Sequence, residues 1–158
     1  MPFKMFIHGL DSSNLGTKSV FFKEKYPDIV IPNFRGDLKD RMEKLHRLLS
    51  DESDIRLIGS SFGGLMAVLF ALENGSKVNR LVLLAPAIHV MGHRDGDVRQ
   101  ITVPVWVYHG KSDEVIPLKE VEMVSKGLFT DLSFHSVEDD HALHKTFKTI
   151  DWDGFLLS

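Results

Sequence analysis

Three residue types that together can carry out acyl transfer occur where predicted strands of this chain end: Ser61, Asp113 and His141. A serine hydroxyl is a weak nucleophile until a histidine accepts its proton and a carboxylate fixes the tautomer of that histidine. The three residues follow one another in the order Ser, Asp, His, which is one of the chain orders in which such triads occur. The chain therefore holds the parts of a nucleophilic triad, provided that the fold brings them together.

The serine lies in the stretch Gly59-Ser60-Ser61-Phe62-Gly63, which matches the pattern G-x-S-x-G. An apolar strand is predicted before it and an apolar helix after it, and in this context the pattern indicates a sharp turn that exposes a nucleophile. Glycine leaves room where a side chain would collide with the neighbouring strand or helix. The helix N-terminus adds N–H groups and a positive dipole end, both favourable to an oxyanion. As an alternative, the stretch is a glycine-rich turn that only caps a helix.

The acid and the base candidates each follow a predicted strand. Asp113 lies in HGKSDEVIP, directly after an apolar run, and His141 lies in DDHALHK, beyond the last predicted strand. Because the carboxyl ends of parallel strands meet at one edge of a sheet, we expect both residues near Ser61. Taken singly, each residue has a structural alternative: Asp113 as a turn residue or helix cap, and His141 as a helix-cap histidine.

Short β-rich runs alternate with longer amphipathic ones, which is typical of repeated βα units on a mostly parallel sheet. The pattern predicts about six strands, at 4–7, 28–31, 54–58, 80–84, 103–108 and 132–137. Apolar residues at three- and four-residue spacings predict helices over 16–26, 37–50, 63–75 and 118–129. A last helix is expected to begin close to His141. With no repeat or linker to divide it, residues 1–158 are expected to form a single α/β domain.

Composition and charge exclude several classes of function. The net charge of -3 gives no electrostatic reason for a nucleic-acid partner or an anionic membrane. The absence of cysteine excludes disulfides, thiolate nucleophiles and cysteine-based zinc sites. No apolar run approaches the roughly 20 residues of a membrane span, and the N-terminus has no signal-peptide pattern. We therefore expect a cytoplasmic protein.

Four stretches of this chain, in order, resemble those of the α/β-hydrolase superfamily, and in particular its small, lidless serine esterases of the YqiA-like kind. FIHGLDSS resembles the oxyanion loop, GSSFGG the nucleophile elbow, HGKSDEVIP the acid turn and DDHALHK the histidine loop. The resemblance implies a minimal three-layer α/β-hydrolase fold without a cap domain. It also implies that Ser61 is the nucleophile, Asp113 the acid and His141 the base. The backbone N–H groups of Leu10 and Phe62 would form the oxyanion hole.

Other residues are alternatives or possible pocket linings. His144 is a second candidate for the base, and the alternative acids are Asp139, Asp140 and Glu114. The residues that we expect to line the pocket or touch substrate are Ser12, Ile88, His89 and Met91, with Val90, Ser13 and Asp11 as further candidates. His89 and His93 have a helical spacing that suggests a metal site, but zinc would need a third ligand cluster, and none is evident. We expect no metal and no cofactor.

These observations predict an enzyme that hydrolyses small carboxylic esters through an acyl-enzyme on Ser61. A thioesterase or amidase using the same triad, or a non-catalytic binding domain of the same fold, is the alternative. Only residues 85–102 separate the fourth and fifth predicted strands, which is too short for a cap domain. The site is therefore expected to be open and shallow, with a small-molecule ester as its partner and neither nucleic acid nor membrane.

Overall fold

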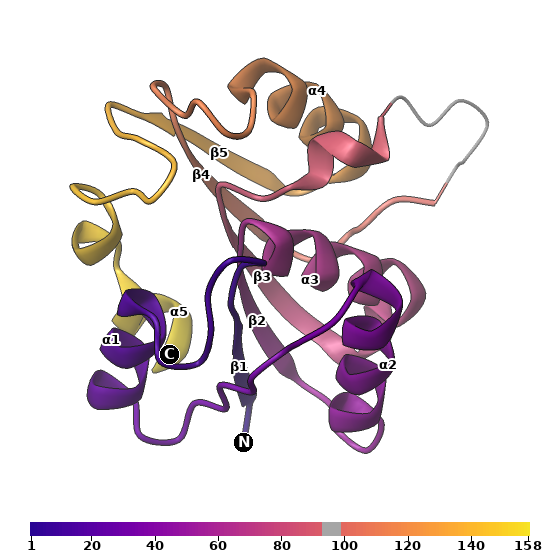
Figure 1. The fold of residues 1–158 in the computed structure, drawn as a ribbon. Coiled ribbons are helices and arrows are strands. Elements are labelled where there is room, and N and C mark those ends of the chain that lie inside the picture. The colour runs from indigo at the N-terminus through magenta and orange to yellow at the C-terminus, as the bar shows by residue number, and fades with distance from the viewer. Residues whose placement is uncertain (93–98) are drawn as a thin grey trace.

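A parallel sheet runs through the middle of the molecule, with helices on both faces (Figure 1). The structure is a computed structural model, and it describes residues 1–92 and 99–158. Within them the sheet has five strands in the spatial order β1-β2-β3-β4-β5, which is also their order in the chain. The strands are β1 (Phe3–Ile7), β2 (Ile55–Ser60), β3 (Val78–Leu84), β4 (Val105–Gly110) and β5 (Leu132–Val137). All four pairings are parallel, so the carboxyl ends of all strands reach the same edge.

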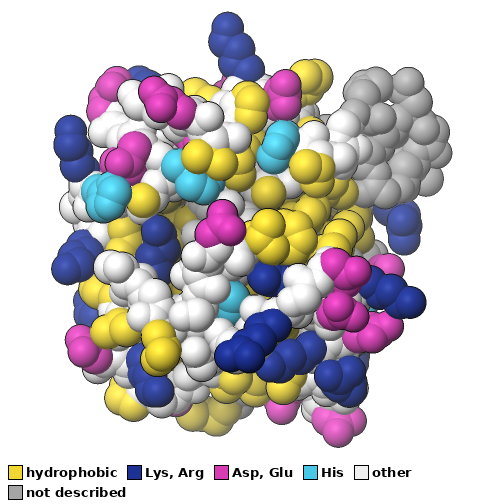
Figure 2. Space-filling model, in the orientation of Figure 1, with side chains coloured by type: hydrophobic (Ala, Val, Ile, Leu, Met, Phe, Trp, Pro, Cys, Tyr) yellow, Lys and Arg dark blue, Asp and Glu magenta, His cyan; other side chains and the backbone are white. Residues whose placement is uncertain are grey.

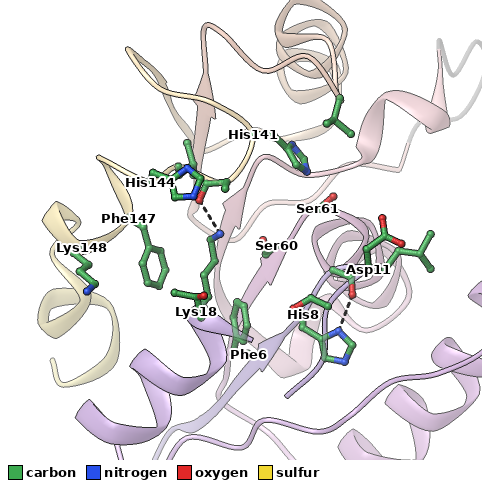
Figure 3. A pocket seen from close by; sticks show the side chains of 17 residues that line it. Phe6, His8, Asp11, Lys18, Ser60, Ser61, His141, His144, Phe147 and Lys148 are labelled. Carbon is green, nitrogen blue, oxygen red and sulfur yellow. Dashed lines mark hydrogen bonds between the residues drawn. The ribbon is translucent and has the colours of Figure 1, made fainter. Parts of the chain in front are cut away.

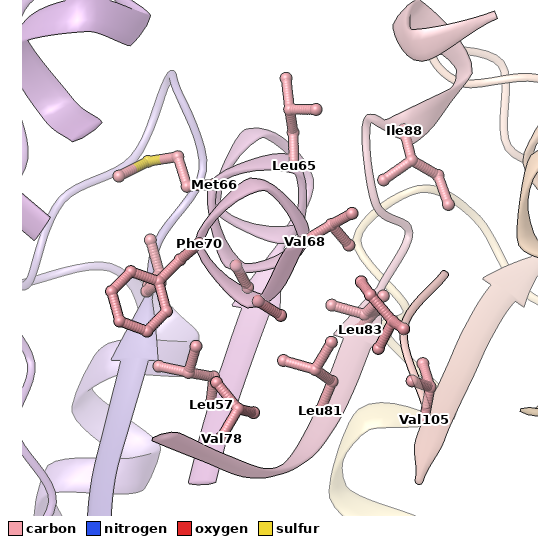
Figure 4. Packing of buried hydrophobic residues seen from close by; sticks show 14 of the residues in the cluster. Leu57, Leu65, Met66, Val68, Phe70, Val78, Leu81, Leu83, Ile88 and Val105 are labelled. Carbon is pink, nitrogen blue, oxygen red and sulfur yellow. The ribbon is translucent and has the colours of Figure 1, made fainter. Parts of the chain in front are cut away.

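Alternation of side chains along the strands divides the core into two layers. In β4, Val105 and Val107 belong to one apolar cluster, whereas Trp106 packs against the other. The first cluster lies under α2 (Leu38–Leu49), α3 (Phe62–Glu73) and α4 (Leu118–Leu128). Figure 4 shows α3 residues of this cluster above the strands, among them Met66 and Phe70. Because α3 lies against the sheet and α2, nearly all of its circumference is apolar.

The opposite face of the sheet is covered by α1 (Thr17–Lys25) and α5 (Trp152–Leu156) (Figure 1). Half of the residues in this layer are aromatic. The Phe22 ring centroid lies 4.9 Å from that of Phe6 and 4.8 Å from that of Trp152. Such tilted and edge-to-face contacts stabilise the layer beyond the area that they bury. The two short helices are therefore attached to the sheet by a dense aromatic cluster.

The predicted strand at 28–31 is reduced to a single bridge between Met5 and Val30. Val30 donates its N–H to Lys4 O (2.9 Å) and accepts from Phe6 N–H (3.1 Å). The segment lies between Pro27 and Pro32, and proline lacks the N–H that would extend the ladder. Five strands therefore form within residues 1–92 and 99–158 where about six were predicted, and the other five predictions are confirmed.

The predicted final helix does not begin near His141. Residues 141–146 form turns, a short 3-10 helix follows at Phe147–Thr149, and α5 begins only at Trp152. Between β3 and β4 the described residues contain one short 3-10 helix, Ile88–Met91. The structure therefore has the expected α/β architecture, and the described part of the connection between β3 and β4 forms no cap domain.

Candidate active site

Ser61 is the single residue between β2 and α3, and its backbone is strained. Its φ of 55° and ψ of -115° lie where residues with side chains are rarely found, at a cost of roughly 1–3 kcal/mol. Strand β3 and the loop after it hold this conformation, because Ser61 N–H donates to Leu84 O and Ser61 O accepts from Ala87 N–H, both at 2.9 Å. The turn therefore lifts the serine side chain out of the sheet.

The glycines around Ser61 are required by close backbone approach. A Cβ atom on Gly63 would overlap the carbonyl oxygen of Ile7, and one on Gly59 would overlap that of Gly63. A Cβ atom on Gly64 would lie 2.7 Å from the Cβ atom of Pro86. The spacing of glycines in GSSFGG thus follows from the tight contact between α3 and the ends of the strands.

Asp113 and His141 are hydrogen-bonded to one another. His141 Nδ1 lies 2.7 Å from Asp113 Oδ2, and the Asp113 side chain is fully buried whereas that of His141 is 27% exposed. The other carboxylate oxygen, Oδ1, accepts the N–H groups of Val115 and Ile116, both at 2.8 Å. Because two backbone N–H groups hold Oδ1 from fixed positions, the orientation of Oδ2 toward His141 is fixed.

A second histidine, His109, also touches Asp113. Its side chain is fully buried, and its Nε2 atom lies 2.9 Å from Ile116 O and 3.2 Å from Asp113 Oδ2. Both neighbours are acceptors, so the hydrogen-bond network assigns the ring proton to Nε2. Burial is the main cause that lowers the pKa of His109 below its ordinary value. His109 is therefore a neutral donor behind the acid of the candidate triad.

The expected oxyanion donors are the N–H groups of Leu10 and Phe62. Within the part of the chain that the structure describes, neither N–H has a hydrogen-bond acceptor. The Phe62 N–H is the first of α3 and adjoins Ser61. Both donors are thus free to receive a negatively charged oxygen, which is what an oxyanion hole requires.

His8 fixes the loop that carries the Leu10 N–H. His8 is almost fully buried, its Nδ1 atom lies 2.7 Å from Gly9 O, and its Nε2 atom accepts the N–H of Phe34 at 2.9 Å. This network places the proton on Nδ1, and burial lowers the pKa of His8. Gly9 O and Leu10 N–H belong to one planar peptide and point in opposite directions. Holding the carbonyl therefore also sets the direction of the N–H.

These elements border one pocket with a volume of about 430 Å³. Ser61, His141, Leu10 and Ser12 line it, together with Lys18. Figure 3 shows the His141 ring and the Ser61 side chain, both of which line this pocket. In the space-filling view, histidine side chains gather around the hollow on this face (Figure 2). The sheet edge thus collects the residues that the sequence analysis selected from four separate segments.

Several expected lining residues lie elsewhere. Ile88 is fully buried in the apolar cluster under α3 and α4, and Met91 packs against that cluster. His89 is half-buried, and its Nδ1 atom has no partner among the described residues. None of these three residues borders the 430 Å³ pocket, whereas Asp11 does. The prediction that they contact substrate therefore has no support from this pocket.

The alternative base belongs to a second, exposed Asp–His pair. His144 Nδ1 lies 2.7 Å from Asp140 Oδ2, with 76% of the histidine and 50% of the aspartate side chain exposed. The hydrogen bond with His144 is the main cause that lowers the pKa of Asp140. Burial alone would raise the pKa of Asp139, but hydrogen bonds from the backbone of Asp140, Thr146 and Lys145 lower it. Glu114, the last alternative acid, is exposed.

Sequence reasoning did not single out His8, His109 or Lys18. A signal existed for the two histidines, because each is a polar residue at or directly after the end of a mostly apolar strand, where buried polar groups need a partner. Lys18 gave no comparable signal, since lysine on an amphipathic helix is ordinarily a solvated residue.

Within the described residues, no three histidine, aspartate or glutamate side chains gather closely enough to hold a metal ion. His93, the second member of the alternative metal pair, lies outside those residues. In the same part of the chain, no helix is long and apolar enough to span a bilayer.

The sequence matches the model of one protein family. Residues 4–126 match the family described as Uncharacterised protein family (UPF0227). Among curated proteins, no match to the sequence was found.

Solved structures share the fold across almost the whole chain. Alpha/beta hydrolase domain-containing protein 10 from mouse superposes with a TM-score of 0.77 at 20% identity, covering 98% of this chain and 90% of its own. Est1E from Butyrivibrio proteoclasticus, solved with ferulic acid bound, gives a TM-score of 0.73 at 16% identity, with coverage of 94% and 84%. The N-formylmaleamic acid deformylase of Pseudomonas putida gives 0.70 at 14% identity, with coverage of 94% and 90%. The likeness to these proteins shows the α/β-hydrolase fold.

Proposed function

Because the chain belongs to the family described as Uncharacterised protein family (UPF0227) and has the α/β-hydrolase fold, we propose that it is a serine hydrolase that cleaves small carboxylic esters. The observation that carries the proposal is the 2.7 Å hydrogen bond that the buried Asp113 carboxylate accepts from His141, a histidine that lines the same pocket as Ser61. A serine on a strained elbow beside an oriented histidine is the arrangement that nucleophilic acyl transfer needs.

In the first half of the reaction, the Ser61 hydroxyl oxygen attacks the ester carbonyl carbon while His141 Nε2 accepts the hydroxyl proton. Asp113 holds the His141 Nδ1–H and stabilises the imidazolium that forms. The carbonyl oxygen becomes an oxyanion, which the N–H groups of Leu10 and Phe62 would bind. Each such donor contributes about 3 kcal/mol to the stability of the transition state.

In the second half, His141 returns the proton to the leaving alcohol as the carbon–oxygen bond of the ester breaks. An acyl group then remains on Ser61. Water attacks this acyl-enzyme with His141 again as the base, and the acid product leaves with the serine hydroxyl restored. The cycle needs no group beyond the side chains and N–H groups already named.

A fluorophosphonate probe, which reacts with activated serines, tests the proposal directly. Ser61→Ala is expected to abolish both covalent labelling and turnover of p-nitrophenyl butyrate, while circular dichroism shows an unchanged fold. Ser60→Ala is the matched control, because it removes the neighbouring hydroxyl, and it is expected to keep the label. Labelling that survives Ser61→Ala and disappears with Ser60→Ala would contradict the assignment.

The purified protein and the same probe also distinguish two other interpretations from an esterase. If purified protein hydrolyses acyl thioesters or amides faster than matched oxygen esters, it is a thioesterase or amidase that uses the same triad. A protein that the probe does not label and that turns over no acyl substrate is a binding domain with this fold. The free N–H groups of Leu10 and Phe62 favour the catalytic interpretation, because a binding domain has no need of an empty oxyanion hole.

A further inference from the structure

Lys18 lies on the wall of the pocket, and its position is fixed. It is in the first turn of α1, and its side chain crosses to the histidine loop, where Nζ donates to Ala142 O at 2.8 Å. The ammonium also lies 5.5 Å from the centroid of the Phe147 ring. Figure 3 shows Lys18 below His144, with Ser60 between it and Ser61. The lysine therefore stands in the same hollow as the candidate nucleophile.

The Lys18 ammonium is only partly satisfied. It has three N–H donors, and within the described part of the chain only one of them has an acceptor. Burial lowers the pKa of Lys18, whereas the nearby Asp140 and Asp139 raise it. Neither carboxylate forms an ion pair with the ammonium: Asp140 is bonded to His144, and Asp139 Oδ2 accepts two backbone N–H groups.

Other charges on the pocket wall do not cancel that of Lys18. Among the described residues that line the pocket, Asp11 is the one acid, and Figure 3 places it on the other side of Ser60 and Ser61. Lys148 is a second, exposed lysine that lines the pocket. The half-buried ammonium thus faces a cavity that offers it room for an anion, and a charge-assisted hydrogen bond would use its remaining donors.

We propose that the pocket binds esters that carry a carboxylate, and that Lys18 binds this carboxylate while Ser61 attacks the ester carbonyl. The proposal rests on the serine hydrolase activity proposed above and adds the substrate class. Such a substrate has an ester and a carboxylate in one small molecule, as in the half-esters of dicarboxylic acids. The carboxylate takes no part in the bond changes, so its contribution is to bind and orient.

Matched pairs of substrates measure this preference. p-Nitrophenyl hydrogen glutarate and p-nitrophenyl methyl glutarate differ in whether the acyl group ends in a carboxylate, and 4-acetoxybenzoate and 4-acetoxybenzamide differ in the same way on the leaving group. In at least one pair the wild type is expected to show kcat/KM about tenfold higher for the anion, which is the usual effect of one charge-assisted hydrogen bond. The preference is expected to weaken as salt is added, because salt screens charge.

Lys18→Gln separates this role from a merely structural one. Glutamine is neutral but can still donate to Ala142 O, so the ratio of kcat/KM for anionic over neutral ester is expected to fall to about one. If Lys18 only held the histidine loop, the substitution would lower kcat/KM for both members of a pair equally and leave the ratio unchanged. Lys148→Gln, which removes one positive charge from the same pocket, is expected to retain the preference.

Three outcomes would overturn the proposal: equal rates within both pairs in the wild type, an unchanged ratio in Lys18→Gln, or an equal loss of preference in Lys148→Gln. Failure of the underlying hydrolase activity gives a different result. In that case, no ester of either pair is cleaved and the fluorophosphonate probe does not label Ser61.

Discussion

Replacing Asp113 with asparagine turns the carboxylate of the candidate triad into an amide of nearly the same shape. The direction in which the new amide turns can be worked out from the structure. Asp113 Oδ1 accepts two backbone N–H groups, both at 2.8 Å, so the amide oxygen takes that position and the NH₂ group faces His141. An NH₂ donor next to His141 Nδ1 places the ring proton on Nε2, where the serine proton has to be accepted.

The expected effect of Asp113→Asn is a loss of kcat with little effect on stability. A histidine in the wrong tautomer typically costs about 10⁴-fold in kcat, which corresponds to about 5 kcal/mol of activation free energy. The two backbone hydrogen bonds to the side-chain oxygen are kept, so the melting temperature should change by only a few degrees. The measurement is kcat for p-nitrophenyl butyrate beside a thermal melt of each protein.

Asp140→Asn is the matched control, because the Asp140–His144 distance is also 2.7 Å. That pair is exposed, so its loss is expected to change kcat by less than about twofold. A correctly folded Asp113→Asn protein that loses less than tenfold in kcat would contradict this role of Asp113, as would an Asp140→Asn protein that loses more than Asp113→Asn.

Four further predictions follow from the same geometry. His141→Ala is expected to lower kcat by several powers of ten and His144→Ala by less than about threefold, and the reverse order in steady-state kinetics would assign the base to His144. Gly63→Ala is expected to destabilise the fold by about 3 kcal/mol or more in urea unfolding, because its Cβ atom would overlap a β1 carbonyl; Gly127→Ala in α4 has open space and should be neutral or stabilising. Because burial lowers the pKa of His8, the unfolded chain binds its proton more readily, and the free energy of unfolding should fall as pH drops below about 6.5; a His8→Asn protein should show a shallower fall between pH 8 and pH 5.5. Since the described residues form no cap domain over the site, p-nitrophenyl acetate and butyrate should be cleaved faster than long-chain esters, and a jump in rate at the solubility limit of the substrate would contradict an open site.

The fold could be predicted because periodicity and local chemistry agree along most of the chain. Val105, Trp106 and Val107 alternate between the two core layers, as a strand buried on both faces requires. The GSSFGG stretch predicted a turn with close backbone contacts, and the overlap that a Cβ atom would make at Gly63 gives the physical reason. Where periodicity and turn residues indicate the same element, the local preference of the chain agrees with its tertiary packing, and the element can be predicted.

The prediction of a strand at 28–31 was wrong. The apolar pattern is a local property of the sequence, whereas the length of a strand depends on its hydrogen bonds with a neighbouring strand. Val30 does pair with β1, but Pro32 has no N–H with which to continue the ladder. The contact partners of His109 and Lys18 could not be predicted, for a related reason. Each contacts a site residue through a side chain whose partner lies in another turn or on another element, and no periodic pattern encodes such a contact.

The error at the final helix has a direct connection with the site. In a helix that began near His141, the N–H groups of Lys145 and Thr146 would bond to the carbonyls of His141 and Ala142. Instead, both N–H groups donate to Asp139 Oδ2, at 2.9 and 2.8 Å, and Leu143 adopts a φ of 55°. The Ala142 carbonyl is thereby left free to accept Lys18, and the turn presents His141 to Asp113. A helix here would have followed the apolar spacing of the sequence, but it would have removed the contact with Lys18. The loop that departs from the helical pattern therefore forms this wall of the pocket.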